Sequence, residues 1–201
     1  MSNTHLDGDT IIANAHALAP AIEAAADAIA RNRRLPDDLI QAMQRAGVFR
    51  IAFPRAWGGP DMDILQQCEI MEILGYHDAS VGWVAMICSD SGHYAARVEE
   101  SVARELYPDM DLLTAGWLAP IGQAHRVDGG FKVSGRWQFG SGCLHAHRLV
   151  GGCALWENGA PVMVTTTSRS AASFGCRSTR SRSTTPGTPR GSLVAAATTT
   201  R

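Results

Sequence analysis

The chain has 201 residues, of which 45% are hydrophobic and 18% charged, and its formal net charge is −1. This content is enough for a buried core in one large domain or two small ones, and the near-neutral charge argues against a general nucleic-acid or membrane-surface binder. No apolar run approaches the roughly 20 residues needed to cross a bilayer, so we expect no membrane span. The five cysteines form no Cys-x-x-Cys pair and the N-terminus lacks signal-peptide features, which predicts a cytoplasmic protein.

The first 50 residues carry the pattern of two helices. Apolar residues recur at alternating steps of four and three from Ile11 to Ile29, which predicts one apolar helix face. Pro20 interrupts this pattern and marks either a kink or the true first turn of the helix. A second helix is predicted from Pro36 to Gly47, because acidic residues fill its first turn and a glycine ends it.

Three more helices are predicted before residue 111. The third follows a cap at Asp61 or Asp63, and the fourth is capped by Ser80. The fifth, over residues 98–107, ends at Pro108. The apolar face predicted for the third helix consists of Ile64, Leu65, Cys68, Met71 and Leu74.

After residue 111 the spacing changes from helical to alternating. Apolar and small residues alternate with polar ones from Phe131 to Ser141, which predicts a β-strand. Asp128 and the two glycines after it supply the turn before that strand, and Asn158-Gly159 is the turn of a second hairpin. The predicted fold class is therefore α+β, with an all-α domain over residues 1–111 and a partial antiparallel β-barrel or sandwich domain over residues 112–167.

Two patterns at the end of the first predicted strand suggest ligands. Small residues at 140–142 let a flat ligand approach the backbone, and Ser141 offers a hydroxyl donor, although a bend is the commoner role of glycine at a strand end. Cys143, His145 and His147 alternate and could share one face of a strand. No fourth ligand accompanies them, so the sequence predicts no metal site.

Several motifs together carry a resemblance to a known family. They are Leu35-Pro36 with Gly47-Val48-Phe49, Pro54 with Trp57-Gly58-Gly59, residues 78–83, and residues 127–137. Their order over about residues 10–165 resembles the acyl-CoA dehydrogenase family, whose members have an N-terminal helical domain, a middle β-domain and a C-terminal four-helix domain. The stretch of residues 135–146 is most similar to the branch that contains two-component flavin-dependent monooxygenases.

The resemblance implies a flavin cofactor, FAD or alternatively FMN. Phe139 and Ser141 match positions that pack on and hydrogen-bond the isoalloxazine ring, and Gly116 with Trp117 match the other contact from the β-domain. His93 lies at the helix end that faces the substrate in relatives. It is the candidate catalytic residue of a monooxygenase, where a histidine manages the peroxide proton, and a structural role at a helix end is the alternative.

Two enzyme activities follow from the resemblance. The first is oxidation of a CH–CH group in a small-molecule substrate such as acyl-CoA, with an electron-transfer partner. The chain as given is then inactive, because the family's catalytic base lies in the C-terminal domain. The alternative is the oxygenase component of a two-component monooxygenase, served by a flavin reductase. Residues 117–120 lack the acidic, glycine-rich segment of many dehydrogenases, which places the acyl-CoA substrate in question. Intact relatives are homotetramers.

The last 34 residues differ in composition from the rest. Residues 168–201 contain six Arg but no Asp, Glu or Lys, which predicts a disordered tail. A non-catalytic binding protein with a basic tail is one alternative. The interpretation that we favour is a shifted reading frame. Codons for residues 184–201, regrouped by one base, permit Asp-Thr-Trp and Gly-Ser-Gly-Ser. These segments resemble the family's next β-domain segment. We therefore expect a truncated chain whose tail binds no nucleic acid.

Overall fold

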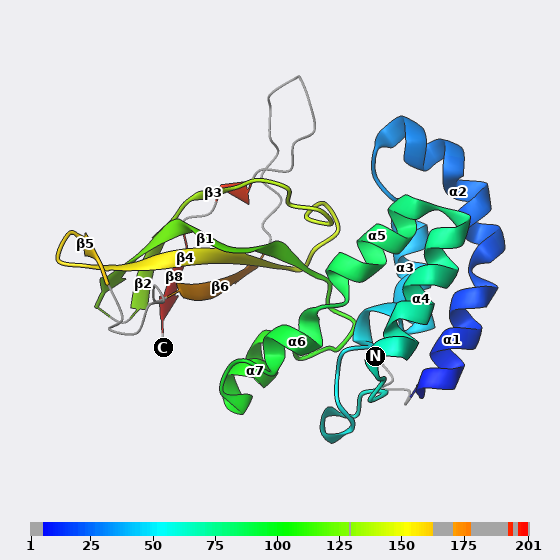
Figure 1. Ribbon diagram of the computed structural model, residues 1–201, viewed down its shortest axis with the longest axis horizontal. Coiled ribbons are helices and arrows are strands. Elements are labelled where there is room, and N and C mark those ends of the chain that lie inside the picture. Colours follow the sequence, from blue (N-terminus) through cyan, green and yellow to red (C-terminus); the bar gives the residue numbers. More distant parts are fainter. Residues whose placement is uncertain (1–5, 129, 163–170, 178–192, 195–196, 201) are drawn as a thin grey trace. The chain divides into compact units, whose positions relative to one another are not determined.

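The computed structural model describes residues 6–128, 130–162, 171–177, 193–194 and 197–200, the last three stretches by their backbone alone. The chain divides into a helical unit that ends at Thr114 and a β-unit that begins at Ala115. The predicted order, a helical domain followed by a β-domain, is confirmed (Figure 1). Within the described residues, no helix is long and apolar enough to cross a membrane.

The helical unit is built from helices whose ends follow from local sequence. Their bounds are α1 Gly8–Ala17, α2 Ala19–Asn32, α3 Asp37–Ala46, α4 Ile64–His77, α5 Ala79–Cys88, α6 Ser91–Ala95 and α7 Glu100–Leu106, with 3-10 turns at Val48–Arg50 and Arg55–Trp57. Pro20 lies in the first turn of α2, so the alternative of a true helix start is confirmed. Gly47 ends α3 with a φ of 86°, as the prediction of a glycine stop requires.

The core of the helical unit lies where α1, α2, α3, α4 and α5 pack together (Figure 1). Its largest fully buried side chains include Ile11, Ile22, Met43, Phe49, Ile70 and Leu74. The helices α4 and α5 approach closely, because a Cβ added at Gly82 would lie 2.7 Å from the Cα of Gly75. This glycine contact fixes how the two helices cross.

Three helix predictions differ from the structure. The predicted face of α4 is confirmed at Leu74, which is buried. It is wrong at Ile64, Leu65 and Cys68, which are exposed, because α4 buries Ile70 and Ile73 together with Leu74. The cap of α5 is Asp78, whose carboxylate accepts from the backbone N–H groups of Ser80 and Val81, so Ser80 itself lies inside the helix. The predicted fifth helix is shorter, and the separate short helix α6 precedes it.

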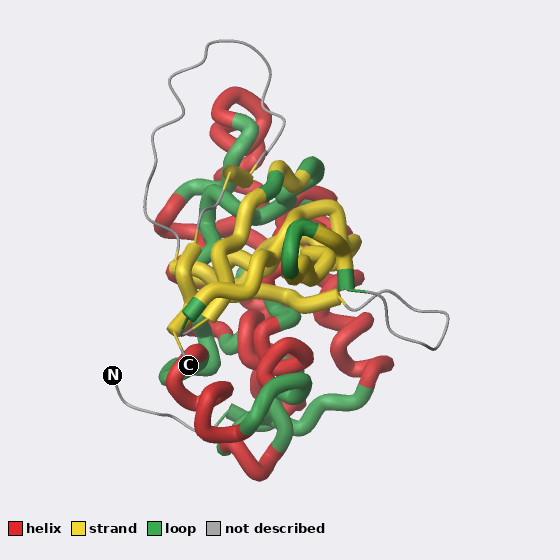
Figure 2. The backbone as a smooth tube through the Cα atoms, turned by 90° about the vertical axis from the view of Figure 1, so that its left-hand side faces the viewer, coloured by secondary structure: helices red, strands yellow, loops and turns green. Residues whose placement is uncertain are grey.

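The β-unit contains a mixed sheet with the strand order β5-β4-β1-β2-β8, in which β6 also pairs with β4, and a second sheet of β3 and β7. Figure 1 labels these strands, and Figure 2 draws them in yellow. The bounds are β1 Thr114–Val127, β2 Gly130–Ser134, β3 Arg136–Trp137, β4 Arg148–Glu157, β5 Ala160–Pro161, β6 Ala171–Arg177, β7 Leu193–Val194 and β8 Ala197–Thr200. The β1–β2, β2–β8, β4–β5 and β4–β6 pairs are antiparallel.

The β1 and β4 strands run in the same direction. Gly116 lies against the backbone of Val150 near the start of both strands. Arg126 pairs with Glu157 near the end of both. The core between them contains Ala124, Val133, Trp137 and Cys153.

Both predicted hairpin turns are present. Val127 pairs with Gly130 across the β1–β2 turn, and Glu157 pairs with Ala160 across the β4–β5 turn. Asn158 and Gly159 have φ values of 50° and 79°, the positive angles that a tight hairpin turn with Asn-Gly needs. The predicted strand over residues 131–141 is interrupted at Gly135 and ends at Trp137, and residues 163–165 of the second hairpin lie outside the described residues.

Parts of the segment 168–201 are extended. The β6, β7 and β8 strands pair with β4, β3 and β2. Backbone groups at an open strand edge accept any extended partner, whatever its side chains. The other residues of the predicted disordered tail lie outside the described residues.

Candidate functional site

The structure brings two of the predicted flavin-contact residues together on the β-unit. Trp117 on β1 and Phe139 after β3 have ring centroids 6.0 Å apart, with the ring planes tilted by 40°. Trp117 is 38% exposed and Phe139 71% exposed. Exposure of large aromatic rings to solvent is unfavourable in free energy, and exposed rings of this kind are typical of ligand-binding surfaces. The pair offers the apolar wall that a flat isoalloxazine ring needs, so the residues present fit a flavin.

The backbone at Phe139 has an unusual conformation. Its φ of 56° lies in the left-handed region, which a bulky residue adopts only when its surroundings hold it there. The backbone N–H of Ser141 donates to the Phe139 carbonyl oxygen at 2.8 Å. Turn hydrogen bonds from Cys143 and His145 to Gly140 and Gly142 continue this arrangement. A network of short backbone bonds therefore holds the Phe139 ring outward.

Ser141 lies two residues after Phe139, in the same turn. Its hydroxyl makes no hydrogen bond with any other described residue, and its side chain is half-buried. A hydroxyl of this kind can donate to the polar edge of a bound ring without breaking an existing bond. The predicted aromatic residue and the predicted hydroxyl thus share one turn.

Gly116 has a structural reason to be glycine. A Cβ added there would lie 1.9 Å from the Val150 carbonyl oxygen on β4. The absence of a side chain is therefore required for the approach of β1 to β4. Strand packing therefore explains why the residue before Trp117 is a glycine. A direct contact between Gly116 and flavin remains a prediction.

Trp137, two residues before Phe139, is buried among glycines of the β-unit. Its indole N–H donates to the Gly152 carbonyl oxygen at 2.9 Å. Gly122, Gly135 and Gly151 crowd the ring so closely that a Cβ at any of them would come within 2.8 Å of an indole atom. Only glycine leaves room for the indole at these three positions. The position of the Trp137 ring therefore requires a glycine at each of them.

Two cysteines near this region, Cys143 and Cys153, have raised pKa values. Burial raises the pKa of Cys153 to about 11. Burial also raises the pKa of Cys143, and the hydrogen bond at its own backbone lowers it. Residues 141–145 form a turn, so Cys143 and His145 do not alternate along a strand as expected. Among the described residues, no three His, Cys, Asp or Glu side chains are placed to hold a metal ion.

His93 lies in the helical unit, on the short helix α6. It is exposed, whereas Ser91, Gly92 and Ala95 of the same helix are buried. Asp90, directly before the helix, has a pKa raised by burial and lowered by the charge of His93. The sequence alone did not single out Asp90. The available signal was its spacing of three residues from His93 across a helix start.

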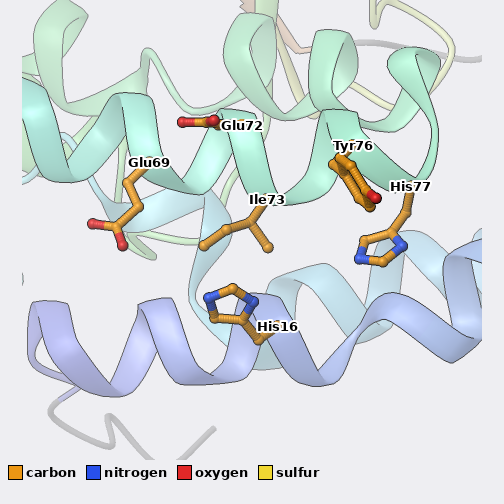
Figure 3. A pocket seen from close by; sticks show the side chains of 6 residues that line it. All are labelled: His16, Glu69, Glu72, Ile73, Tyr76 and His77. Carbon is orange, nitrogen blue, oxygen red and sulfur yellow. The ribbon is translucent and has the colours of Figure 1, made fainter.

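A surface groove of about 420 Å³ lies between α1 and α4. His16, Glu69, Glu72, Ile73, Tyr76 and His77 line it (Figure 3). The figure shows His16 extending from α1 toward Ile73 on α4. The His77 Nδ1 is already 2.9 Å from the Glu23 carboxylate on α2. The groove contains none of the residues predicted to bind flavin or to act in catalysis.

Residues 12–110 match the model of the acyl-CoA dehydrogenase N-terminal domain. The chain is 32% identical over 147 residues to the flavin-dependent monooxygenase oxygenase subunit HsaA of Rhodococcus jostii, an alignment that covers 73% of this chain and 38% of that protein. It is 34% identical over 143 residues to the indole-3-acetate monooxygenase of Pseudomonas putida, which covers 67% of this chain and 37% of that protein.

Among solved structures, the HsaA monooxygenase of M. tuberculosis aligns with a TM-score of 0.76 at 29% sequence identity, covering 86% of this chain and 45% of that one. The chain spans about two-fifths of the length of the two curated relatives. The match to the helical domain covers the unit that contains His93, and the structural match reaches into the β-unit. The two curated relatives are named as monooxygenases, and the first of them as flavin-dependent. The chain therefore belongs to the acyl-CoA dehydrogenase family.

Proposed function

We propose that the protein acts as the oxygenase component of a two-component flavin-dependent monooxygenase. The observation that carries this proposal is the likeness to the oxygenase subunit HsaA and to the indole-3-acetate monooxygenase. One relative is named for an aromatic acid, so the proposed substrate is a small aromatic molecule. The name "oxygenase subunit" supports a separate flavin reductase as the proposed partner. The homotetramer remains a prediction.

The residues of this chain have distinct proposed roles. Reduced flavin, FAD or FMN, supplies the electrons for oxygen activation when bound. Trp117 and Phe139 would cover its flat face and exclude water there, and Ser141 Oγ would donate to its polar edge. His93 would hold or release a proton at one imidazole nitrogen. Residues 112–167 are the proposed flavin-binding part of the chain.

The oxidation of an acyl thioester fits the relatives less well. Both curated relatives are monooxygenases, and the segment 117–120 departs from the pattern of many dehydrogenases. Among the described residues, nothing favours the third alternative, a nucleic-acid-binding role of the basic tail. We therefore propose the monooxygenase activity alone.

Flavin binding can be measured on the 201-residue chain directly. Under anaerobic conditions the chain is titrated with reduced FMN or reduced FAD while tryptophan fluorescence is recorded. Quenching is expected in the wild type and should be largely lost in the Trp117→Phe variant. Trp83→Phe is the matched control, because Trp83 is an exposed tryptophan of the helical unit. Equal loss of quenching in both variants would contradict the proposed site.

The contribution of the second ring is tested by Phe139→Ala. Aromatic pairs contribute about 0.5–1.5 kcal/mol beyond area burial, so the dissociation constant for reduced flavin should rise about two- to thirteenfold. Phe139→Tyr retains the ring and should bind as the wild type does. An alanine variant with unchanged affinity would remove Phe139 from the site.

The reaction class is tested with two assays. In the first, a flavin reductase and NADH supply reduced flavin, and oxygen-dependent hydroxylation of indole-3-acetate or a simple phenol is followed by chromatography. In the second, acyl-CoA is offered with a redox dye and no reductase. Dye reduction by acyl-CoA would overturn the monooxygenase proposal in favour of dehydrogenation.

A further inference from the structure

The helix α5 is apolar on every side. Its sequence contains no charged residue, and Ser80 is its one polar side chain. Val81 and Ala85 lie on the side of the helix that is buried. A helix that is hydrophobic all round is normally covered all round. In the structure, however, Trp83 is 52% exposed and Met86 is 41% exposed, so α5 has a second apolar side that faces solvent.

The preceding helix α4 extends this solvent-facing side. The helices α4 and α5 are joined by Asp78 alone and pack against each other as an antiparallel pair (Figure 1). They approach closely at Gly75 and Gly82. Each residue turns an α-helix by about 100°, so Leu65 on α4 and Trp83 on α5 are rotated by similar angles, in the same sense, from these glycines. In an antiparallel pair this rotation brings both side chains to the same side.

Four large apolar side chains on this side form what we call the α4–α5 face: Ile64, Leu65, Trp83 and Met86. Ile64 and Leu65 are 66% and 76% exposed. If a whole large side chain has an area of roughly 200 Å², close to what a buried aromatic residue contributes, the face exposes on the order of 500 Å². Two copies that cover each other would bury on the order of 1,000 Å², which is the lower limit for a specific protein interface.

Acidic side chains border the α4–α5 face. Glu69 and Glu72 lie on the side of α4 that lines the groove toward α1. Residues 1–114 as a whole carry 17 Asp and Glu against eight Arg and no Lys. Two helical units therefore repel each other through their charge, and an apolar contact between them has to overcome this repulsion.

We propose that the α4–α5 face is the contact between two copies of this chain, related by a two-fold axis. In such a pair the same face is used by both copies, so one self-complementary apolar surface is sufficient. Trp and Met are enriched at protein interfaces, and Trp is a frequent anchor of the binding energy. The two α4–α5 hairpins would stack as four helices and cover α5 on both sides. The inference uses the helical unit alone and does not depend on the proposed function.

The contact is tested by sedimentation equilibrium of the 201-residue chain over micromolar protein concentrations. The wild type should form a dimer whose population rises with concentration. Trp83→Ser should raise the dimer dissociation constant at least about thirtyfold, as the loss of an anchor residue does, and Leu65→Ser should raise it as well. The matched control is Ile121→Ser, because Ile121 is 53% exposed but belongs to the β-unit. Far-ultraviolet circular dichroism checks that each variant is folded.

The salt dependence shows which forces hold the pair together. Added NaCl screens the repulsion between the two acidic units, so the dimer dissociation constant should fall as the salt concentration rises. The opposite dependence is expected if the six arginines of residues 168–201 in one copy bind the acidic unit of another, because screening weakens an ionic attraction. A dimer that dissociates as salt is added would therefore overturn the proposal.

Two further outcomes contradict the contact. A wild type that stays monomeric at every concentration would refute it and leave the α4–α5 face to a different partner, such as the rest of a longer protein. A dimer that Ile121→Ser weakens and Trp83→Ser does not would place the contact in the β-unit instead. None of these measurements needs flavin, so the contact and the flavin site can fail independently.

Discussion

The Arg50–Asp111 ion pair allows a quantitative test of what stabilises the helical unit. Its side chains are only 9% and 16% exposed. Arg50 Nε donates to Asp111 Oδ1 at 2.8 Å, and a second bond joins Nη2 to Oδ2. The pKa of Arg50 is raised by its hydrogen bond to Asp111, whereas burial lowers it. The Gln44 side chain also donates to the Asp111 carbonyl oxygen, at 3.2 Å.

Asp111→Asn removes the charge and keeps the shape, which takes from the buried Arg50 guanidinium the carboxylate that it is bonded to. Breaking a buried pair in this way costs about 3–5 kcal/mol. Small domains lose roughly 4–8 °C of thermal midpoint per kcal/mol, so the drop should be at least about 12 °C. The measurement is thermal unfolding followed by far-ultraviolet circular dichroism at 222 nm, where helices dominate the signal.

The control is Glu100→Gln on α7. Arg104 and Glu100 form a pair of the i, i+4 kind whose side chains are 51% and 66% exposed, and such pairs contribute about 0.3–0.5 kcal/mol. Arg104 is kept, because its guanidinium also lies 4.5 Å from the Trp57 ring centroid. If Asp111→Asn destabilises no more than Glu100→Gln does, the reasoning from burial is wrong.

A double variant distinguishes the stabilisation by the Arg50–Asp111 bonds from the cost of burying one charge without the other. Arg50→Met with Asp111→Leu replaces both charges with apolar groups and should recover most of the loss. Failure to recover would show that the hydrogen bonds of this pair, and not the buried charge left alone, account for the stability.

Three further predictions concern the β-unit and the last part of the chain. Gly122→Ala should destabilise the β-unit by about 1–3 kcal/mol, because the added Cβ would lie 2.4 Å from a Trp137 ring atom, as tested by near-ultraviolet circular dichroism during urea unfolding. Cys153 should resist iodoacetamide at pH 8, where its thiol is protonated because its pKa is about 11, while the exposed Cys68 reacts; mass spectrometry of the folded protein decides between them. The frame shift proposed for residues 168–201 predicts that another frame of the encoding DNA continues with Asp-Thr-Trp and Gly-Ser-Gly-Ser codons, and resequencing that shows no such frame would refute it.

Helix ends were predictable because they depend on neighbouring residues. Pro20 and Gly47 act through backbone conformations that their own chemistry imposes, so the sequence places them without knowledge of the fold. The Asn158-Gly159 turn is predictable for the same reason. The backbone conformation at each of these positions depends on the residue there and its neighbours in the sequence, so it is predictable without the fold.

The buried face of α4 was not predictable in this way. Ile64 and Leu65 are apolar, yet both are exposed, whereas the residues that α4 buries are Ile70, Ile73 and Leu74. Apolar spacing shows that a helix has a face but not where its neighbours end. The β1 strand poses a similar problem, since it buries residues at its start and at Gly122 and Ala124, whereas much of the stretch between them is exposed.

The candidate site was predictable in part. Trp117, Phe139 and Ser141 came from a resemblance, and the structure places two of the rings 6.0 Å apart, a distance that no spacing rule gives. Asp90 was not singled out, because an aspartate before a helix normally caps it. Its difference from Asp78 appears only when the hydrogen bonds of both are known.

The left-handed backbone at Phe139 has a consequence for laboratory evolution of this protein. Glycine at that position would relieve about 1–2 kcal/mol of backbone strain, so a selection for thermal resistance alone should enrich glycine there. A selection for flavin retention should deplete glycine at the same codon. The ratio of enrichment in the two selections measures, at one position, how far the needs of folding and of ligand binding oppose each other.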